Sequence, residues 1–233
     1  MLMGDGGKKD LEGGKKMKNE AISLSENFSK CVEFHGHMCP GLAIGFQAAR
    51  TLMDRLDARK APDEELVAIM ETDTCSADAI QVMTGCTFGK GNFIFKNYGK
   101  HAFSLLDRRK GKGVRVCLRT DVFQMDSEFL SLSEKVQKDE ASEKEIGRFR
   151  QLQQQRIQKI LEMDPEDLFK IEEFLPAIPA KARILGSGIC DFCGEATKMD
   201  LLRKIDGKKV CIPCAEKHTL GNSSSHSPFS LPK

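Results

Sequence analysis

Apolar residues recur at helical spacing in two stretches near the start of the chain. The first stretch predicts a helix that leads into a histidine-rich segment, and its apolar positions are Leu24, Phe28, Cys31 and Val32. A second helix is expected from Pro40 to about Leu56, where apolar residues form one stripe. Small residues on another face of it (Ala43, Gly45, Ala48) permit close approach to a neighbouring helix or to a second subunit. Ordinary core packing is the simpler explanation of that face.

Apolar runs farther along the chain predict strands between further helices. Leu66–Met70 is expected to be a buried strand, and residues 76–83 continue as a helix. Residues 92–98 are strand-like, and residues 102–106 are expected to pair with residues 114–118 in a hairpin. This order lacks the regular alternation of a doubly wound sheet, so we predict a mixed helix and sheet core of the α+β class.

The second half of the core is more polar and predominantly helical in pattern. Residues 127–163 carry a narrow apolar stripe, and Gly147 is expected to divide them into two helices. A further short helix is predicted over residues 164–174, and Pro176 and Pro179 mark a linker.

Composition shifts divide the chain into four parts. Residues 1–20 mix Gly, Lys, Asp and Glu with few large apolar side chains, and the last residues are rich in Ser and Pro. We therefore expect a flexible tail over 1–20, the α+β core over 21–183, a small cysteine module over 184–217 and a second flexible tail over 218–233.

Charge and cysteine content narrow the functional classes. The 233 residues carry a formal net charge of +2, which is too small to imply a nucleic-acid partner by itself. No apolar run approaches the length of a membrane span, so no membrane partner and a cytoplasmic location are expected. Nine cysteines are an odd number, and two pairs are spaced Cys-x-x-Cys. In a reducing compartment this indicates metal binding or thiol chemistry.

The most specific signal lies near the C-terminus. Two Cys-x-x-Cys turns are separated by a segment in which Asp206 and Gly207 supply a hairpin turn, and their cysteines are Cys190, Cys193, Cys211 and Cys214. This spacing predicts a four-cysteine zinc ribbon with a closed metal shell. So small a module has almost no core, and zinc binding, worth about 10–16 kcal/mol in small structural sites, would supply its folding energy.

A second candidate metal site lies at residues 35–41. His35, His37 and Cys39 alternate along the chain, and an extended backbone would point all three to the same side. Pro40 suits the first position of a helix, which would place Cys39 at a helix N-terminus. The competing interpretation is a strand end with two ordinary histidines and a buried cysteine.

Cys75 lies where a predicted strand gives way to a helix and is the fourth candidate ligand, so the predicted core set is His35, His37, Cys39 and Cys75. Carboxylates at Glu71, Asp73 and Asp78 could orient a ligating imidazole. The core site would bind a second divalent metal, whose identity the sequence leaves open. The alternative is that Cys75 and Cys86 are buried small hydrophobic residues.

These motifs resemble the FmdE family, which is named after a component of formylmethanofuran dehydrogenase. The matching segments are His35-Gly-His-Met-Cys-Pro-Gly41, Asp73-Thr-Cys75 with Asp78-Ala-Ile-Gln81, and Thr84-Gly-Cys-Thr-Phe-Gly-Lys-Gly-Asn92. The resemblance covers roughly residues 24–217. It implies an α+β core that forms an intertwined homodimer, a metal site near the His/Cys motif and an appended zinc ribbon. It does not imply dehydrogenase activity of this chain.

Three functions remain in competition. The first is a metal-binding accessory or sensor protein whose zinc ribbon contacts a protein or nucleic-acid partner. The second is an enzyme that uses an open metal position, or Cys39 as nucleophile with Asp73 or Glu71 as base. The third is a nucleic-acid-binding regulator that acts through the basic residues of the ribbon, which are Lys198, Arg203, Lys204, Lys208 and Lys209. We expect the first function, and the chain's own enzymatic activity stays open.

Overall fold

The computed structural model describes residues 26–122, 127–182 and 185–219, and the chain divides between Lys181 and Ala182 into two compact units. The predicted tail over 1–20 and nearly all of the predicted tail over 218–233 lie outside the described residues. Within the described part of the chain, no helix is both long enough and apolar enough to cross a membrane.

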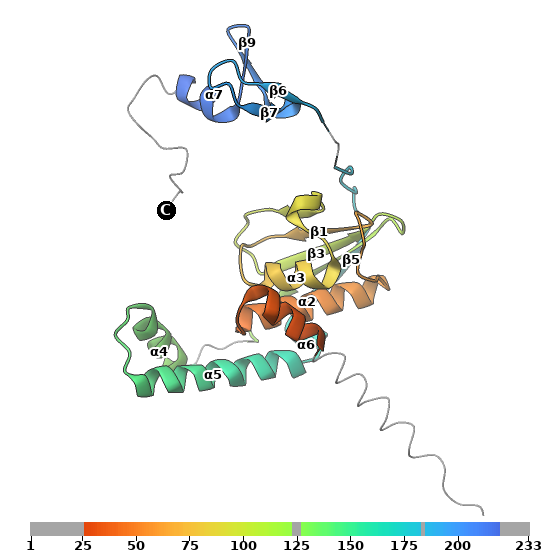
Figure 1. Ribbon diagram of the computed structural model, residues 1–233. Helices are drawn as coiled ribbons and strands as arrows, with labels where there is room; N and C mark the ends of the chain where they lie inside the picture. The colour runs from red at the N-terminus through yellow and green to blue at the C-terminus, as the bar shows by residue number, and fades with distance from the viewer. Residues whose placement is uncertain (1–25, 123–126, 183–184, 220–233) are drawn as a thin grey trace, which may run out of the picture. The chain divides into compact units, whose positions relative to one another are not determined.

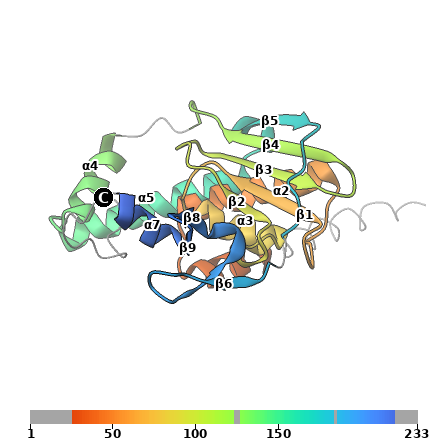
Figure 2. The same cartoon turned by 90° about the horizontal axis from the view of Figure 1, so that it is seen from above.

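A mixed five-stranded sheet forms the centre of the first unit, in the order β2-β1-β3-β4-β5 (Figures 1 and 2). Its strands are β1 Leu66–Met70, β2 Phe93–Phe95, β3 Ala102–Asp107, β4 Lys112–Leu118 and β5 Phe169–Phe174. The β1 and β2 strands are parallel, and the other neighbouring pairs are antiparallel. The predicted hairpin of β3 and β4 is present, with Leu105 opposite Val114. The β3 strand is buried along its whole length and anchors the core.

Helix α2, Pro40–Leu56, packs on this sheet and forms the hydrophobic centre together with α3, Ser76–Thr84. A Cβ added at Gly45 would lie 2.4 Å from the carbonyl oxygen of Ser76, so the two helix backbones approach each other closely at this glycine. The small-residue face of α2 is therefore used inside the chain, which agrees with ordinary core packing rather than with contact to a second subunit.

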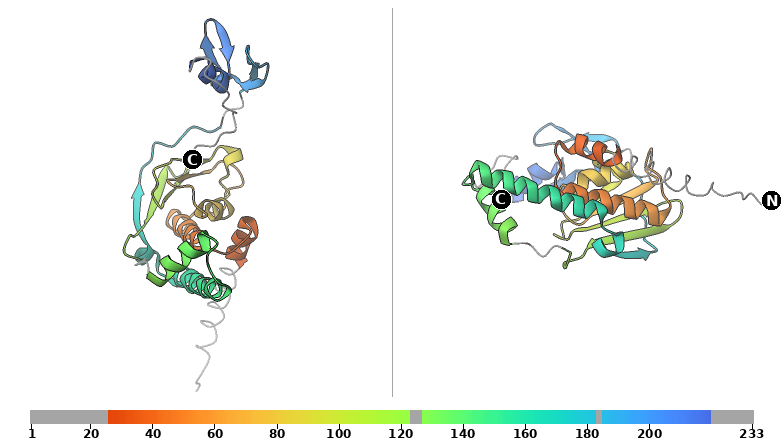
Figure 3. Two further views of the ribbon diagram at one scale, coloured as in Figure 1. Left: turned by 90° about the vertical axis from the view of Figure 1, so that its left-hand side faces the viewer. Right: turned by 90° about the horizontal axis from the view of Figure 1, so that it is seen from below.

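Two helices that follow the sheet form an arm, and Figure 3 shows the second of them alongside α2. They are α4, Ser127–Gln137, and α5, Glu143–Glu162. The prediction that Gly147 divides them is wrong, because α5 begins earlier with a capping box between Ser142 and Glu145. The end of α5 is fastened to the core where the Gln47 amide donates to the carbonyl oxygen of Ile160 (2.8 Å).

The predicted helix over residues 164–174 is wrong beyond its first turn. Helix α6 spans only Pro165–Leu168, and residues 169–174 form β5 on the edge of β4. Phe169 is buried and Ile171 partly so, while Lys170 is exposed between them, which is the alternation of a half-buried strand. Pairing with the open edge of β4 outweighs the local helical preference, and it is not visible in the local sequence.

The second unit consists of two short hairpins and a helix. Its elements are β6 Ser187–Ile189, β7 Ala196–Lys198, η2 Met199–Leu201, β8 Arg203–Ile205, β9 Lys208–Val210 and α7 Ile212–Thr219. The β8–β9 turn has positive φ at Asp206 (48°) and Gly207 (79°), as the predicted two-residue turn requires. Its buried cluster is very small, comprising Cys190, Val210, Cys211 and Ala215. Such a core supplies little folding energy without a metal.

Candidate metal centres

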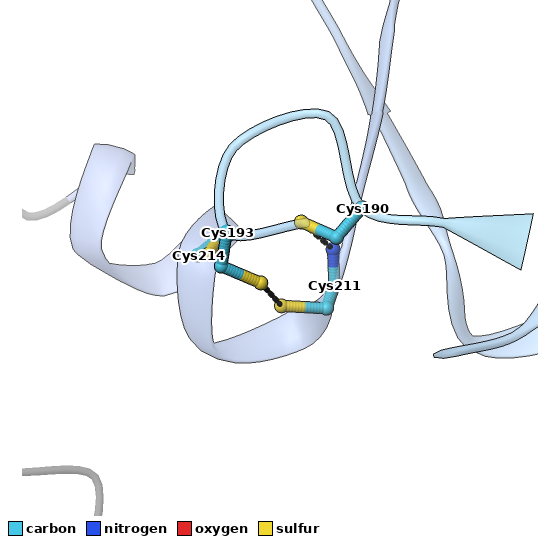
Figure 4. Close-up of side chains that lie close together, drawn as sticks. All are labelled: Cys190, Cys193, Cys211 and Cys214. Carbon is cyan, nitrogen blue, oxygen red and sulfur yellow. Dashed lines mark hydrogen bonds between the residues drawn. The ribbon is translucent and has the colours of Figure 1, made fainter. Parts of the chain in front are cut away.

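The four cysteines of the second unit converge. One ligand atom from each of Cys190, Cys193, Cys211 and Cys214 lies within 4.8 Å of the other three, and Figure 4 shows the side chains gathered between the turn after β6 and the start of α7. The Sγ atoms of Cys193 and Cys211 are 3.8 Å apart. A tetrahedral zinc with Zn–S bonds of about 2.3 Å requires sulfur separations of about 3.8 Å. The donor set and its spacing therefore fit zinc.

Hydrogen bonds prepare one side of this site for ionisation. Backbone N–H groups at Cys193 and Cys211 lower the pKa of the Cys190 thiol to about 6, and the Cys211 N–H lies 3.3 Å from the Cys190 Sγ. Burial and the neighbouring thiols raise the pKa of Cys214 to about 12. A bound dication would supply the charge that the Cys214 thiolate needs.

In the core, ligand atoms of His35, Cys39 and Cys75 lie within 4.8 Å of one another. The helix over residues 26–35 ends at His35, and Gly36 then turns the chain with a φ of 89°. Cys39 is extended (φ −146°, ψ 161°) and caps α2, because the Leu42 N–H donates to its Sγ at 3.3 Å. Three chain segments are thus brought to one point.

The His35 ring is held at both nitrogens. Its Nδ1 lies 2.7 Å from Oδ2 of Asp78, and its Nε2 lies 3.8 Å from Sγ of Cys39. A neutral imidazole that donates from Nδ1 to Asp78 presents the Nε2 lone pair to the two thiols. Zinc bound by one imidazole and one thiolate would set these atoms about 3.6 Å apart. The core set therefore also fits a divalent metal.

His37 lies outside this group of three. Its side chain is exposed, and its ring stacks on His35 with centroids 4.4 Å apart. The predicted alternation of three ligands along an extended segment is not what brings the core ligands together, because His35 ends a helix. The left-handed turn at Gly36 instead lets His35 meet Cys39.

Cys75 is positioned by the packing of α3 on α2. The Ser76 hydroxyl donates to the Gly41 carbonyl oxygen (2.7 Å), and a Cβ added at Gly41 would lie 3.2 Å from the Cys75 Cβ. Burial and the hydrogen bond with Cys39 raise the pKa of the Cys75 thiol. Cys86, in contrast, is fully buried in the hydrophobic cluster and outside the group of ligands.

The three acidic residues near this site have different surroundings. Asp78 orients His35, whereas Asp73 is exposed. Glu71 accepts two hydrogen bonds from the Arg115 guanidinium, at 2.7 and 3.0 Å, and the pair raises the pKa of Arg115. This engagement of Glu71 argues against it as a free base. The sequence patterns did not single out Arg115, and only its charge within the apolar β4 strand could have drawn attention to it.

Comparison with protein families gives two matches along the chain. The model described as "FmdE, Molybdenum formylmethanofuran dehydrogenase operon" matches residues 34–170, which include the core ligand group. The prokaryotic dksA/traR C4-type zinc finger matches residues 183–220, which include all four cysteines of the second unit. Zinc binding by that unit is thus supported by both sequence pattern and geometry.

Two individual proteins are similar over most of the chain. A probable S-adenosyl-L-methionine-binding protein of Archaeoglobus fulgidus is 33% identical over 205 residues, which cover 84% of this chain and 54% of the relative. This chain therefore spans about half of that relative. The crystal structure of an FmdE-like protein from Syntrophus aciditrophicus, of the tungsten formylmethanofuran dehydrogenase type, matches at 27% identity and a TM-score of 0.54. The match covers 82% of this chain and 91% of that protein.

Proposed function

This chain belongs to the FmdE family and carries a C-terminal C4-type zinc finger, and from that premise we propose that it is a metal-binding accessory or sensor protein. In this proposal His35, Cys39 and Cys75 bind a divalent metal in the core, and the zinc finger contacts a partner. The observation that carries the proposal is the convergence of one imidazole and two thiols within 4.8 Å.

Orientation of the imidazole supports metal binding over simple packing. A buried histidine could satisfy one nitrogen with Asp78 and leave the other among apolar groups, but here the second nitrogen faces Cys39. Imidazole and thiolate are ligands that borderline-soft divalent metals such as zinc favour. A carboxylate behind a ligating histidine is the usual means of fixing its tautomer.

A metal-dependent enzyme is the second candidate, and the number of ligands in the core favours it. Two cysteines and one histidine leave one position of a tetrahedral shell for water or another small ligand. The exposed His37 lies beside His35, and if it completed the shell it would favour the accessory or sensor role. A spectrum of the cobalt-substituted core separates a closed four-ligand shell from an open one.

The decisive experiment measures metal content and affinity in matched variants of the full chain. We expect two metal ions per wild-type chain and one in Cys39→Ala, with the finger zinc retained. Asp78→Asn is expected to weaken the core metal about 10- to 100-fold by releasing His35. The exposed Asp73→Asn is the charge-matched control and is expected to have no effect. One metal per wild-type chain, or equal effects of both variants, contradicts the proposal.

We further propose a cytoplasmic homodimer whose zinc finger contacts a protein partner. Nine free cysteines suit a reducing compartment. The small-residue face of α2 is covered by α3, so the α4–α5 arm is the better candidate for the contact between subunits. The basic β8–β9 hairpin makes nucleic acid the alternative partner, which a salt-dependent gel shift would detect.

A further inference from the structure

A cavity of about 550 Å³ lies between the first turn of α2, the end of β4 and the α4–α5 arm. Pro40, Gly41 and Ile44 line one side of it, and Phe129 and Arg156 line another. Its volume falls within the range of small-molecule sites, about 300–1,000 Å³. It is therefore large enough for an organic ligand, not only for water or a single ion.

The charged groups around this cavity are of one sign. Lys100, His101, Arg119 and Arg156 line it, and none of its described lining residues is Asp or Glu. Arg119 Nε donates to the backbone carbonyl oxygen of Glu166 (2.9 Å), a neutral partner that orients the guanidinium and keeps its charge. The N-terminus of α2 adds the positive end of a helix dipole. The cavity therefore favours an anionic group.

The remaining wall is apolar and partly desolvated. The Arg156 guanidinium carbon lies 4.9 Å from the centre of the Phe129 ring, and Ile44 and Leu118 also face the cavity. Burial lowers the pKa of Arg156, which shows that this cation has lost part of its hydration. An anion beside a partly dehydrated guanidinium is bound more tightly than one in open water. Apolar walls would accommodate a hydrophobic body next to that anion.

Gly41 connects this cavity with the core metal ligands. It lines the cavity, and a Cβ added to it would lie 3.8 Å from Sγ of Cys75 and 3.9 Å from Sγ of Cys39. Only a residue without a side chain leaves this space between the cavity and the two thiols. An occupant of the cavity would therefore lie next to the core metal.

We propose that this cavity binds an organic anion, in which a carboxylate, sulfonate or phosphate group is carried on an apolar or aromatic body. The inference goes beyond metal binding, since the cations and apolar walls are contributed by residues other than the metal ligands. A second cavity, of about 620 Å³, lies near Phe34 and Val82 with Lys60 and Lys90 on its border, and it provides an internal control.

The test is a fluorescence titration of the full chain with anilinonaphthalene sulfonate and with its neutral parent, phenylnaphthylamine. The two probes share an apolar body and differ in the anionic group. We expect the sulfonate to bind at least about tenfold more tightly at low salt. Lys100→Met and Arg119→Met are each expected to weaken the sulfonate about three- to tenfold and to leave the neutral probe unchanged.

Lys90→Met removes the same charge at the control cavity and is expected to leave both affinities unchanged. Equal affinities for the two probes, or a loss in Lys90→Met with none in Lys100→Met and Arg119→Met, would overturn the inference. Far-ultraviolet circular dichroism confirms that each variant is folded. The titration does not depend on the metal, so a chain without core metal that still binds the sulfonate would refute the proposed function and leave this inference intact.

Discussion

Gly45→Ala is expected to destabilise the core, although the same substitution within a helix is normally favourable. Gly45 lies in the middle of α2, where the backbone of Ser76 approaches it most closely. A Cβ at this position would meet the Ser76 carbonyl oxygen at 2.4 Å and the Ser76 Cα at 2.5 Å. Both contacts are with backbone atoms, so no side-chain rotation can relieve them.

The magnitude follows from two opposing effects. Alanine gains about 0.5–1 kcal/mol over glycine in a helix interior. Overpacking a tight core costs about 1–3 kcal/mol, and the contact distance must increase from 2.4 Å to the 3.4 Å at which ordinary contact begins. We therefore expect a net loss of about 1–2 kcal/mol in the free energy of unfolding. The movement would also displace Cys75, and metal sites tolerate distance errors of only about 0.2 Å.

Gly147→Ala is the matched control, because Gly147 lies inside α5 and nothing lies within 4 Å of a Cβ added there. Urea unfolding followed by circular dichroism is expected to show this variant stabilised by up to about 1 kcal/mol and Gly45→Ala destabilised. Cobalt titration of the core should show weaker binding in Gly45→Ala alone. If both variants gained equal stability, the close approach of α2 and α3 would be refuted.

The remaining predictions concern the zinc finger, the subunit contact and the arm. Cys190→Ser should release about one zinc per chain and make residues 185–217 protease-sensitive while the core stays folded; unchanged zinc content would contradict this. Sedimentation at micromolar concentration should give twice the chain mass of 25.9 kDa, and a monomer mass would exclude the homodimer. Hydrogen bonds from Lys135 and Ser142 lower the pKa of Glu145 from 4.5 to about 2. The cap of α5 should therefore be intact above pH 4.5 and be lost as the pH falls towards 2, measured by amide exchange at the start of α5, and Glu145→Gln should remove that dependence.

Local signals predicted the elements whose ends are determined by their own residues. Helix α2 runs from Pro40 to Leu56 as expected, because proline at the first position and a continuous apolar stripe are both written in that segment. The β8–β9 hairpin follows from Asp206-Gly207, since both residues tolerate positive φ. The cysteine spacing of the finger is equally local, and its family match agrees with the predicted module.

Features determined by distant segments were not predictable in the same way. Residues 169–174 became a strand because the edge of β4 was available, and nothing nearby in the sequence reports that edge. The composition of the core ligand group depended on the end of a helix at His35 and on the turn at Gly36, so the alternation of residues indicated the right neighbourhood for an incorrect reason. Placement of Cys75 required the packing of α3 on α2, which the small residues of α2 indicated only as one of two alternatives.

The two metal centres therefore differ in what holds them together. The finger gathers four thiols from one short segment with a very small core, so its fold depends on its metal. The core group takes its ligands from the end of one helix and the starts of two others, and α2, α3 and the sheet are packed independently of it. Its geometry is thus determined by the fold and can retain a vacant coordination position, which a metal that had to supply the folding energy would be expected to close. Together with the cavity on the other side of Gly41, this makes the core metal the one suited to respond to a small ligand and the finger metal the one suited to structure.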